Sequence, residues 1–217
     1  MRITRASVTP FALPLRSNFQ TARGTMDSRP GFALLVEAQG GLVGCGEASP
    51  LAVFGTESRR ECGIALALLA ERLPGCTLDD IESFLDAAER LAPRAPAARA
   101  ACDVALHDLL ARSRGFSLGA LLLERYGRIS GPVQPTGPDP QLSVNALIGG
   151  EDRATVLRAA AAAQAAGYQV LKLKLGTRAL SEELDLVEAL LGQGTDVLQL
   201  RLDVNGGWTA VSYTHLT

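Results

Sequence analysis

The pattern of apolar and polar positions changes along the chain from a strand period to a helix period. Residues 2–13 are strand-like, and the apolar runs Phe32–Gln39 and Leu42–Glu47 are joined by Gly40-Gly41, which is typical of a tight hairpin. Apolar residues then recur at helical spacing. The helices are expected over about 56–73, 77–91, 96–115 and 118–126. Strands followed by packed helices predict an α+β domain over residues 1–127.

The starts of the first two helices carry polar residues suited to capping. Thr56 and Glu57 are expected to cap the first helix, and Thr77 with Asp80 forms a capping-box-like start to the second. Residues 128–140 are rich in proline and glycine and read as a linker.

After the linker the pattern alternates between strands and helices. Strands are expected at 143–148, 169–175 and 197–203, and helices at 152–166 and 181–191, the second with Ser181 as N-cap. This order is typical of right-handed parallel crossovers. Residues 141–217 number 77, whereas a complete eight-unit barrel needs about 250. The fold class predicted is therefore α/β, an incomplete (β/α) barrel behind an α+β N-terminal capping domain. Residues 210–217 carry no helix pattern and are expected to be non-native sequence.

Composition excludes several classes of function. A net charge of −2 and a pI near 5.7 give no reason to expect nucleic acid as a partner. The N-terminus lacks a continuous apolar run, so no signal peptide is expected, and no run approaches the roughly 20 residues of a membrane span. Cys45, Cys62, Cys76 and Cys102 lie far apart without a CxxC pair, which favours a reducing cytoplasm over a disulfide or zinc scaffold.

The expected strand Leu171–Leu175 reads LKLKL, so Lys172 and Lys174 share one face and the leucines share the other. In an antiparallel surface sheet the lysines would simply face water. Strands in a βαβ array are covered on both faces, so two lysines there would be crowded and shielded from solvent. Such crowding favours loss of a proton from one of them, which a lysine base near neutral pH requires.

The next expected strand ends in Arg201, Asp203 and Asn205 on one face. Asp203 stands at the carboxyl end of its strand, where this fold builds its active sites, and a carboxylate there suits a hard cation such as Mg²⁺. The alternative is that Asp203–Gly206 is only turn chemistry. His107 is expected to be structural, and two histidines in 217 residues give a serine or cysteine triad little support.

Several segments together resemble the enolase superfamily in its muconate-lactonising branch. They are GEASPL at 46–51, CDVALHDLLARSRG at 102–115, LKLKLG at 171–176 and LRLDVNGGW at 200–208. VNALIGG at 144–150, with the lysine and aspartate motifs, is most similar to the o-succinylbenzoate synthases of menaquinone biosynthesis. The resemblance covers nearly all of residues 1–209.

The resemblance implies a role for each matching residue. Lys174 would be the acid/base that removes a proton next to the substrate carboxylate, and Lys172 would stabilise the enediolate. Asp203 would be the first of three carboxylate ligands of Mg²⁺, with Arg201 and Asn205 supporting the site. Loops near 17–29 and 52–55 would shape specificity through Phe19, Met26, Arg29, Phe54 and Gly55.

The implied activity is Mg²⁺-assisted proton abstraction from a small-molecule carboxylate followed by dehydration. Alternatives within the superfamily are an N-acylamino-acid racemase or dipeptide epimerase, which would not dehydrate, and a muconate cycloisomerase. A lysine Schiff-base aldolase and a non-catalytic fragment are alternatives of another class. The remaining metal ligands and the opposite lysine would lie on later strands, so the chain is expected to be inactive alone. The sequence does not indicate an oligomeric state.

Overall fold

The computed structural model describes residues 1–21, 24–127, 143–150, 152–176, 178–192 and 199–204, while only the backbone is described for 17–21 and for 24 and 25. The chain forms two compact units, Met1–Asp139 and Pro140–Thr217, called here the cap unit and the barrel unit. The predicted linker at 128–140 and the tail at 210–217 lie outside the described residues.

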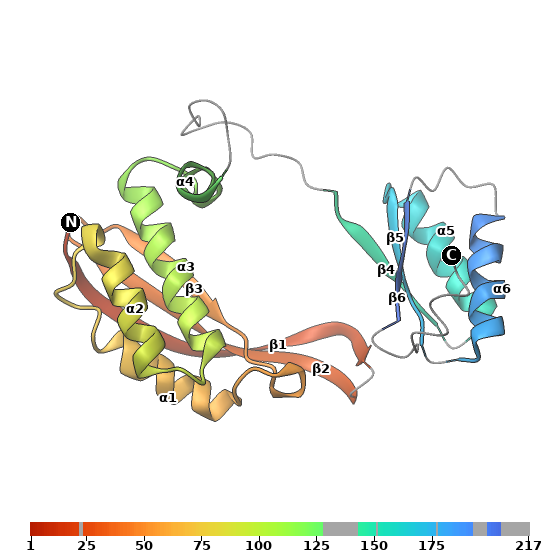
Figure 1. Ribbon diagram of the computed structural model, residues 1–217, viewed down its shortest axis with the longest axis horizontal. Coiled ribbons are helices and arrows are strands. Elements are labelled where there is room, and N and C mark those ends of the chain that lie inside the picture. The colour runs from red at the N-terminus through yellow and green to blue at the C-terminus, as the bar shows by residue number, and fades with distance from the viewer. Residues whose placement is uncertain (22–23, 128–142, 151, 177, 193–198, 205–217) are drawn as a thin grey trace. The chain divides into compact units, whose positions relative to one another are not determined.

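The cap unit has an antiparallel sheet in the order β1-β2-β3, followed by helices (Figure 1). Its elements are β1 (Ile3–Thr21), β2 (Gly24–Ala38), β3 (Val43–Ala48), the 3₁₀ turns η1 (Ala52–Phe54) and η2 (Leu78–Asp80), α1 (Arg59–Ala70), α2 (Ile81–Leu91), α3 (Pro96–Ser113) and α4 (Leu118–Tyr126). The glycine pair at the β2–β3 turn has φ of 88° at Gly40 and 80° at Gly41, values that favour glycine in a tight hairpin.

Strands β1 and β2 are longer than the apolar pattern predicted. Figure 1 shows them running on as a two-stranded ribbon beyond the helices, and the backbone pairing extends to Thr21 opposite Gly24. The expectation of a loop over residues 17–29 is therefore wrong for most of that segment. Pro10 and Pro14 do not stop β1, because β1 is an edge strand whose outer N–H groups need no ladder partner.

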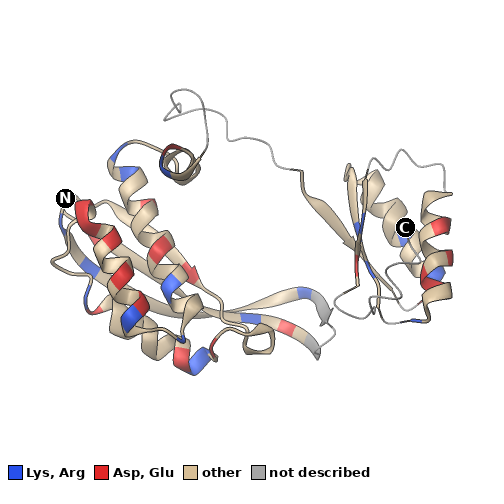
Figure 2. Cartoon of the chain, viewed as in Figure 1, with Lys and Arg blue, Asp and Glu red and all other residues tan. Residues whose placement is uncertain are grey.

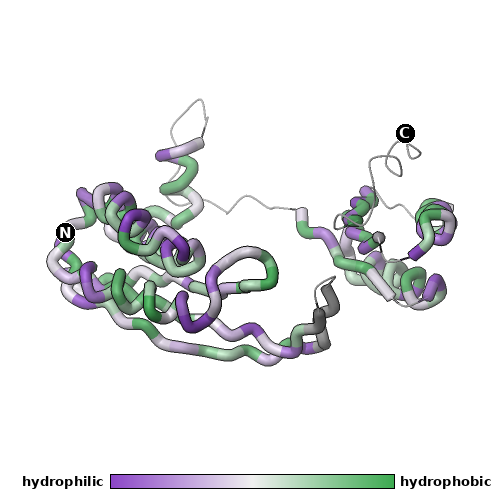
Figure 3. Tube along the Cα trace, turned by 60° about the horizontal axis from the view of Figure 1, so that its bottom comes forward, coloured by the Kyte–Doolittle hydropathy of each residue, from purple (hydrophilic) through white to green (hydrophobic). Residues whose placement is uncertain are grey.

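Helix α3 packs closely on β3 because two strand glycines leave room for it. A Cβ on Gly46 would stand 1.9 Å from the Ala101 carbonyl oxygen, and one on Gly44 would stand 2.2 Å from that of Ala105. Helices α1 and α3 also contact β2, and α2 packs on α3. Bands of hydrophobic and hydrophilic positions alternate around these helices (Figure 3). Their apolar faces build one core with the sheet.

Two predicted helix starts need correction. Ser58, and not Thr56 or Glu57, caps α1: its hydroxyl accepts from the Glu61 N–H while the Glu61 carboxylate accepts from the Ser58 N–H. Thr77 makes no side-chain cap, because the turn η2 comes between it and α2. The hydroxyl of Thr56 instead accepts from the Leu51 N–H, within the segment that precedes α1.

His107 is a structural residue of the cap unit, as expected. It is buried on α3, and its Nδ1 lies 2.7 Å from an Asp103 carboxylate oxygen. Its Nε2 lies 3.2 Å from the Tyr126 hydroxyl on α4, and that hydroxyl donates to Glu82 on α2. Hydrogen bonds through His107 and Tyr126 therefore link α2, α3 and α4.

The barrel unit is a parallel sheet in the order β4-β5-β6 with two helices against it (Figure 1). Its elements are β4 (Asn145–Ile148), α5 (Arg153–Ala165), β5 (Val170–Lys174), α6 (Leu180–Leu191) and β6 (Gln199–Asp203). Leucines of β5 pack against apolar residues of α5 and α6 to form a second core. This is the expected β-α-β-α-β order and the first part of a (β/α) barrel.

The two barrel-unit helices begin differently. Asp152 caps α5, its carboxylate accepting from the Thr155 N–H at 2.7 Å, as the expected start at 152 implied. Ala179, and not Ser181, is the N-cap of α6, and it makes no side-chain hydrogen bond. None of the described helices is both long and apolar enough to span a lipid bilayer.

Candidate active site

Strand β5 separates its leucines from its lysines as the alternation predicted. Leu171, Leu173 and Leu175 are buried against the helices. Lys172 and Lys174 occupy the opposite face of the sheet, with about a third of each side chain exposed (36% and 35%). The lysines are therefore less shielded from solvent than expected, because the three described strands form an open sheet whose lysine face is not covered by further described strands.

The two lysines converge on one carboxylate oxygen. The Nζ of Lys172 lies 2.8 Å from Oδ2 of Asp203, and the Nζ of Lys174 lies 2.9 Å from the same atom. The parallel register explains the meeting, because Lys174 is directly paired with Asp203 across the β5–β6 ladder. Two ammonium groups and one carboxylate sum to one positive charge, so this cluster, called here the lysine–aspartate cluster, attracts an anion.

Of the two residues predicted to support the site, the structure describes Arg201. Arg201 pairs with Lys172 in the register and therefore shares the face of the cluster. Its guanidinium is exposed and donates to the Gln199 side chain at 3.2 Å. Asn205 lies outside the described residues. Figure 2 shows that charged positions occur on the strands of this sheet as well as along α6.

The predicted specificity residues lie in the cap unit. Phe19 and Met26 are backbone partners near the end of the β1–β2 ribbon. The Arg29 guanidinium donates to the Ser49 carbonyl at 2.9 Å, which ties β2 to the segment after β3. Phe54 is about half exposed at the end of η1, and Gly55 follows with φ of 97°.

Glu183, in the first turn of α6, is a residue near the site that the sequence analysis did not single out. It is fully buried, and its Oε1 accepts from the backbone N–H groups of Gly176 and Arg178, at 2.6 and 3.1 Å. These two groups follow directly after the lysine strand. The period of α6 could have flagged it, since Glu183 shares the apolar side with Leu186 and Leu190.

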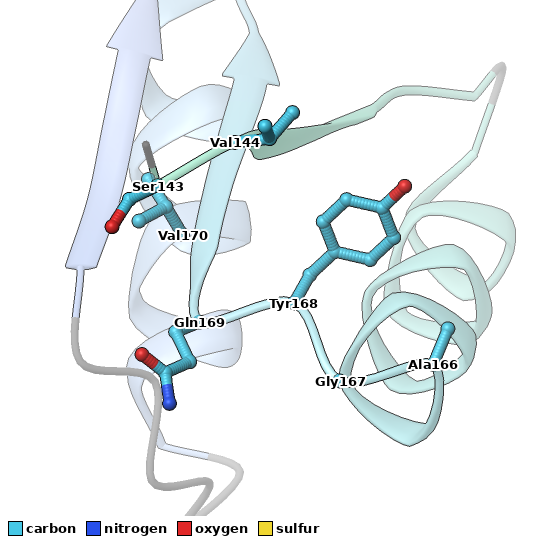
Figure 4. Close-up of a pocket in the computed structure, with 7 residues that line it drawn as sticks. All are labelled: Ser143, Val144, Ala166, Gly167, Tyr168, Gln169 and Val170. Atoms are coloured by element: carbon cyan, nitrogen blue, oxygen red, sulfur yellow. The ribbon is translucent and has the colours of Figure 1, made fainter. Parts of the chain in front are cut away.

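A surface hollow of about 290 Å³ lies in the barrel unit, away from this chemistry. Figure 4 shows the residues that line it, which are Ser143, Val144, Ala166, Gly167, Tyr168, Gln169 and Val170. They belong to the segments that lead into β4 and β5, at the amino ends of the strands. Lys174 and Asp203 are the last residues of their strands. The hollow is therefore not the candidate active site, which this architecture forms at the carboxyl ends.

The described residues do not complete a magnesium site. Mg²⁺ demands near-ideal octahedral geometry and oxygen ligands. Asp203 offers one carboxylate, and its Oδ2 already accepts from two ammonium groups. No group of three or more His, Cys, Asp or Glu side chains that could hold a metal gathers within the part of the chain that the structure describes. The chemistry these residues support by themselves is that of the lysines and the carboxylate.

Comparison with known proteins decides the family. Residues 3–122 match the N-terminal domain of the mandelate racemase / muconate lactonizing enzyme family, which is more than half of the chain. The chain belongs to this family. The resemblance to the enolase superfamily and the predicted fold class are thereby confirmed.

Three relatives show the range of activities among proteins similar to this chain. A hydrophobic dipeptide epimerase of Enterococcus faecalis is 26% identical over 209 residues, covering 96% of the chain and 55% of the relative. A chloromuconate cycloisomerase of Pseudomonas putida is 28% identical over 217 residues, covering 96% and 54%. A dipeptide epimerase structure from Methylococcus capsulatus, complexed with Mg and the dipeptide L-Arg-D-Lys, is 26% identical with a TM-score of 0.85, covering 100% and 57%.

These comparisons bear on the predicted activity in two ways. The chain spans about half the length of the curated relatives it matches. The three relatives are isomerases by name, and they therefore favour the epimerase, racemase and cycloisomerase alternatives over the predicted synthase.

Proposed function

We propose that this chain supplies one side of the active site of an epimerase or racemase, which acts at the carbon next to a carboxylate. The substrate class is an N-acylated amino acid or a dipeptide. The observation that carries the proposal is the lysine–aspartate cluster, in which Lys172 and Lys174 meet at Asp203 Oδ2. The names of the two dipeptide epimerases support the reaction class.

The choice of lysine at these two positions supports proton transfer. The chain has 21 lysine and arginine residues together, and Lys172 and Lys174 are the only lysines in its sequence. Arginine keeps its proton at any physiological pH, whereas lysine can lose it when crowded or desolvated. A site that needed only positive charge could use arginine here as elsewhere in the chain. A site that needs a base can use lysine here, whereas arginine would not serve.

The reaction divides between the two lysines. Lys174 first gives up its own proton to solvent, and the resulting neutral amine takes the α-proton, while the electron pair of the broken C–H bond moves onto the substrate carboxylate as an enediolate. The proposed role of the Lys172 ammonium, which meets Lys174 at Asp203 Oδ2, is to stabilise that developing negative charge. Return of a proton to the opposite face of the carbon, by a group outside the described residues, inverts the centre and restores the carboxylate.

Asp203 has two partners in the proposed mechanism of the whole protein. In this structure it neutralises one of the two ammonium charges, which holds the lysines together. We propose that it also supplies one ligand to Mg²⁺ in a complete barrel, a role supported by the Mg complexed in the Methylococcus capsulatus epimerase structure. The 217-residue chain alone is then expected to bind Mg²⁺ weakly and to show no turnover. Tight one-to-one Mg²⁺ binding in a calorimetric titration would contradict this.

A protein with a completed barrel tests the reaction. Residues 1–204 are joined to the second barrel half of the Methylococcus capsulatus epimerase, and dipeptides are incubated with it in D₂O. Deuterium is expected to enter the α-carbon with loss of configuration, as followed by NMR. Lys174→Arg is expected to lower the exchange rate by at least about 100-fold, since an arginine cannot act as the base. Arg153→Lys, a change of the same kind at an exposed position of α5, is expected to leave the rate unchanged.

Three results would overturn the proposal. Exchange that survives Lys174→Arg would remove its base. Dehydration of a hydroxy-carboxylate without epimerisation of dipeptides would restore the o-succinylbenzoate synthase prediction. A borohydride-trapped adduct between Lys174 and a carbonyl substrate would indicate a Schiff-base aldolase instead.

A further inference from the structure

We infer that Glu183 is a positioning residue for Lys174, which it serves by fixing the loop that follows the lysine strand. The inference rests on the proposed function only for the importance of Lys174, since the contacts themselves belong to this chain. Glu183 stands in the first turn of α6 with none of its surface exposed. Burying a carboxylate is strongly unfavourable unless hydrogen bonds compensate it. The partners of Glu183 therefore indicate why it is there.

Those partners are backbone groups of the β5–α6 loop. Oε1 of Glu183 accepts from the Gly176 N–H at 2.6 Å and from the Arg178 N–H at 3.1 Å. Hydrogen bonds to an ionised acceptor are roughly twice as strong as neutral ones. Gly176 has φ of 87°, so the chain turns sharply two residues after Lys174. The carboxylate therefore holds the turn in which the lysine strand ends.

A purely helical role does not explain this geometry. An acid in the first turn of a helix stabilises the positive end of the helix dipole while remaining in water. Glu182 meets that description, because it is exposed in the same turn. Glu183 reaches back by seven residues in sequence to Gly176, away from its own helix. The two neighbouring glutamates therefore differ in role. Glu182 is a solvated helix acid, whereas Glu183 is buried and holds the loop.

The clamp connects with the strands on both sides. The Leu175 N–H donates to the Asp203 carbonyl at 2.9 Å, so the β5–β6 ladder continues up to the residue before the clamped turn. The guanidinium of Arg178 donates to the carbonyl of Gly150, two residues after the end of β4. Lys174 therefore lies on a strand end that is tied to β4, to β6 and to α6. Loss of the Glu183 oxygen would release the last of these ties.

Chemical labelling of amines can report a change in the surroundings of Lys174, because the 217-residue chain has only two lysines and each can serve as a reference for the other. The wild-type chain, Glu183→Met, Glu183→Gln and the control Glu182→Gln are methylated with limiting formaldehyde and cyanoborohydride, and fragment-ion mass spectrometry gives the Lys174-to-Lys172 labelling ratio. Glu183→Met removes the oxygen that accepts both hydrogen bonds and is expected to change the labelling ratio at least three-fold. Glu183→Gln keeps a carbonyl oxygen and is expected to stay within two-fold of wild type, and Glu182→Gln is expected to match wild type.

Hydrogen exchange keeps the inference testable if Glu183→Met fails to fold. In Glu183→Gln the neutral carbonyl accepts weaker hydrogen bonds than the carboxylate, so the amides of Gly176 and Arg178 are expected to exchange several-fold faster, while those of Leu171 and Leu173 keep their rates. Unchanged exchange at Gly176 and Arg178 would overturn the inference, and so would an unchanged labelling ratio in a folded Glu183→Met. Both measurements use the chain without turnover. Failure of the epimerase proposal would therefore leave both measurements valid, and a negative result for the clamp would leave the epimerase proposal standing.

Discussion

The cap unit and the barrel unit each bury one glutamate among the described residues, and the two carboxylates hold different things. Glu57 in the cap unit accepts from the N–H groups of Ala97 and Ala98, at 3.1 and 2.9 Å, and so fixes the start of α3. Glu183 in the barrel unit accepts from the loop beside Lys174. The same physical device thus anchors a packed helix in one unit and the end of a reactive strand in the other.

The distribution of reactive side chains follows the same division. All four cysteines belong to the cap unit and both lysines belong to the barrel unit. Cys62 and Cys102 are fully buried in the cap core, whereas the lysines keep about a third of their surface in water. Thiol chemistry therefore reports on the packing of the cap, and lysine chemistry reports on the candidate site.

Removing the buried carboxylate of the cap unit should have the largest effect on stability. Glu57→Met leaves two backbone donors near the start of α3 without an acceptor, and each such buried donor costs about 1 to 3 kcal/mol. The free energy of unfolding of the cap unit should fall by about 3 kcal/mol in urea denaturation, followed through the exposure of Cys62 and Cys102 to a thiol reagent. The lysine labelling ratio should not change.

Glu71→Met is the matched control, because Glu71 is an exposed glutamate at the end of α1 and its loss should cost less than about 0.5 kcal/mol. A Glu57→Met chain as stable as the control would mean that the α3 start does not depend on this carboxylate. A change in the Lys174-to-Lys172 labelling ratio in Glu57→Met would mean that Glu57 also affects the lysine strand. The two buried glutamates would then not have separate roles.

High pH should weaken the cap unit through its buried thiols. Burial raises the pKa of Cys62 to about 12 and that of Cys102 to about 12, with the neighbouring Glu57 adding to the shift of Cys62. An unfolded thiol ionises with a pKa near 8.5. The stabilisation is therefore complete below about pH 8.5 and is lost as the pH rises toward 12. As the pH rises from about 9 to 10, each thiol should lower the free energy of unfolding by about 1 kcal/mol.

The measurement is denaturant unfolding at several pH values in the presence of a reductant. Cys102→Ala should remove about half of the loss, because one of the two titrating groups is gone. An unchanged pH dependence in that variant would show that other groups cause the loss. The exposed Cys45 should react with a thiol reagent in the native protein much faster than the two buried thiols.

The smallest effect should come from giving α6 a side-chain N-cap, which α5 already has in Asp152. Ala179 is the exposed N-cap of α6 and makes no side-chain hydrogen bond. Ala179→Ser should stabilise the barrel unit by about 0.5 to 1 kcal/mol, because its hydroxyl can accept a first-turn N–H. Serine is preferred to aspartate because Glu182 and Glu183 already place two carboxylates in that turn. Thermal unfolding checks the gain, and Ala179→Gly, which should give a smaller gain, is the comparison variant.

Local pattern determined much of the secondary structure. The helices α3 and α4 begin and end within about two residues of their predicted bounds, because proline, serine and glycine mark their ends. The β1–β2 ribbon was underestimated, since strand pairing beyond residue 13 depends on a partner strand and leaves little apolar periodicity to read. Capping by Ser58 rather than Thr56 was likewise decided by where the first helical turn forms in three dimensions.

The sequence by itself determined that Lys172 and Lys174 share a face, that leucines cover the other face, and that Asp203 ends the next strand. These features depend on the two-residue period of a strand and on the order of the elements. Only the tertiary structure decided that both ammonium groups meet at one oxygen of Asp203, because that depends on the register of β5 against β6. It also decided that Glu183 is buried against the loop while Glu182 faces water. The two adjacent glutamates look equivalent in the sequence. Because α6 packs on the sheet with one side, it buries Glu183 and leaves Glu182 in water.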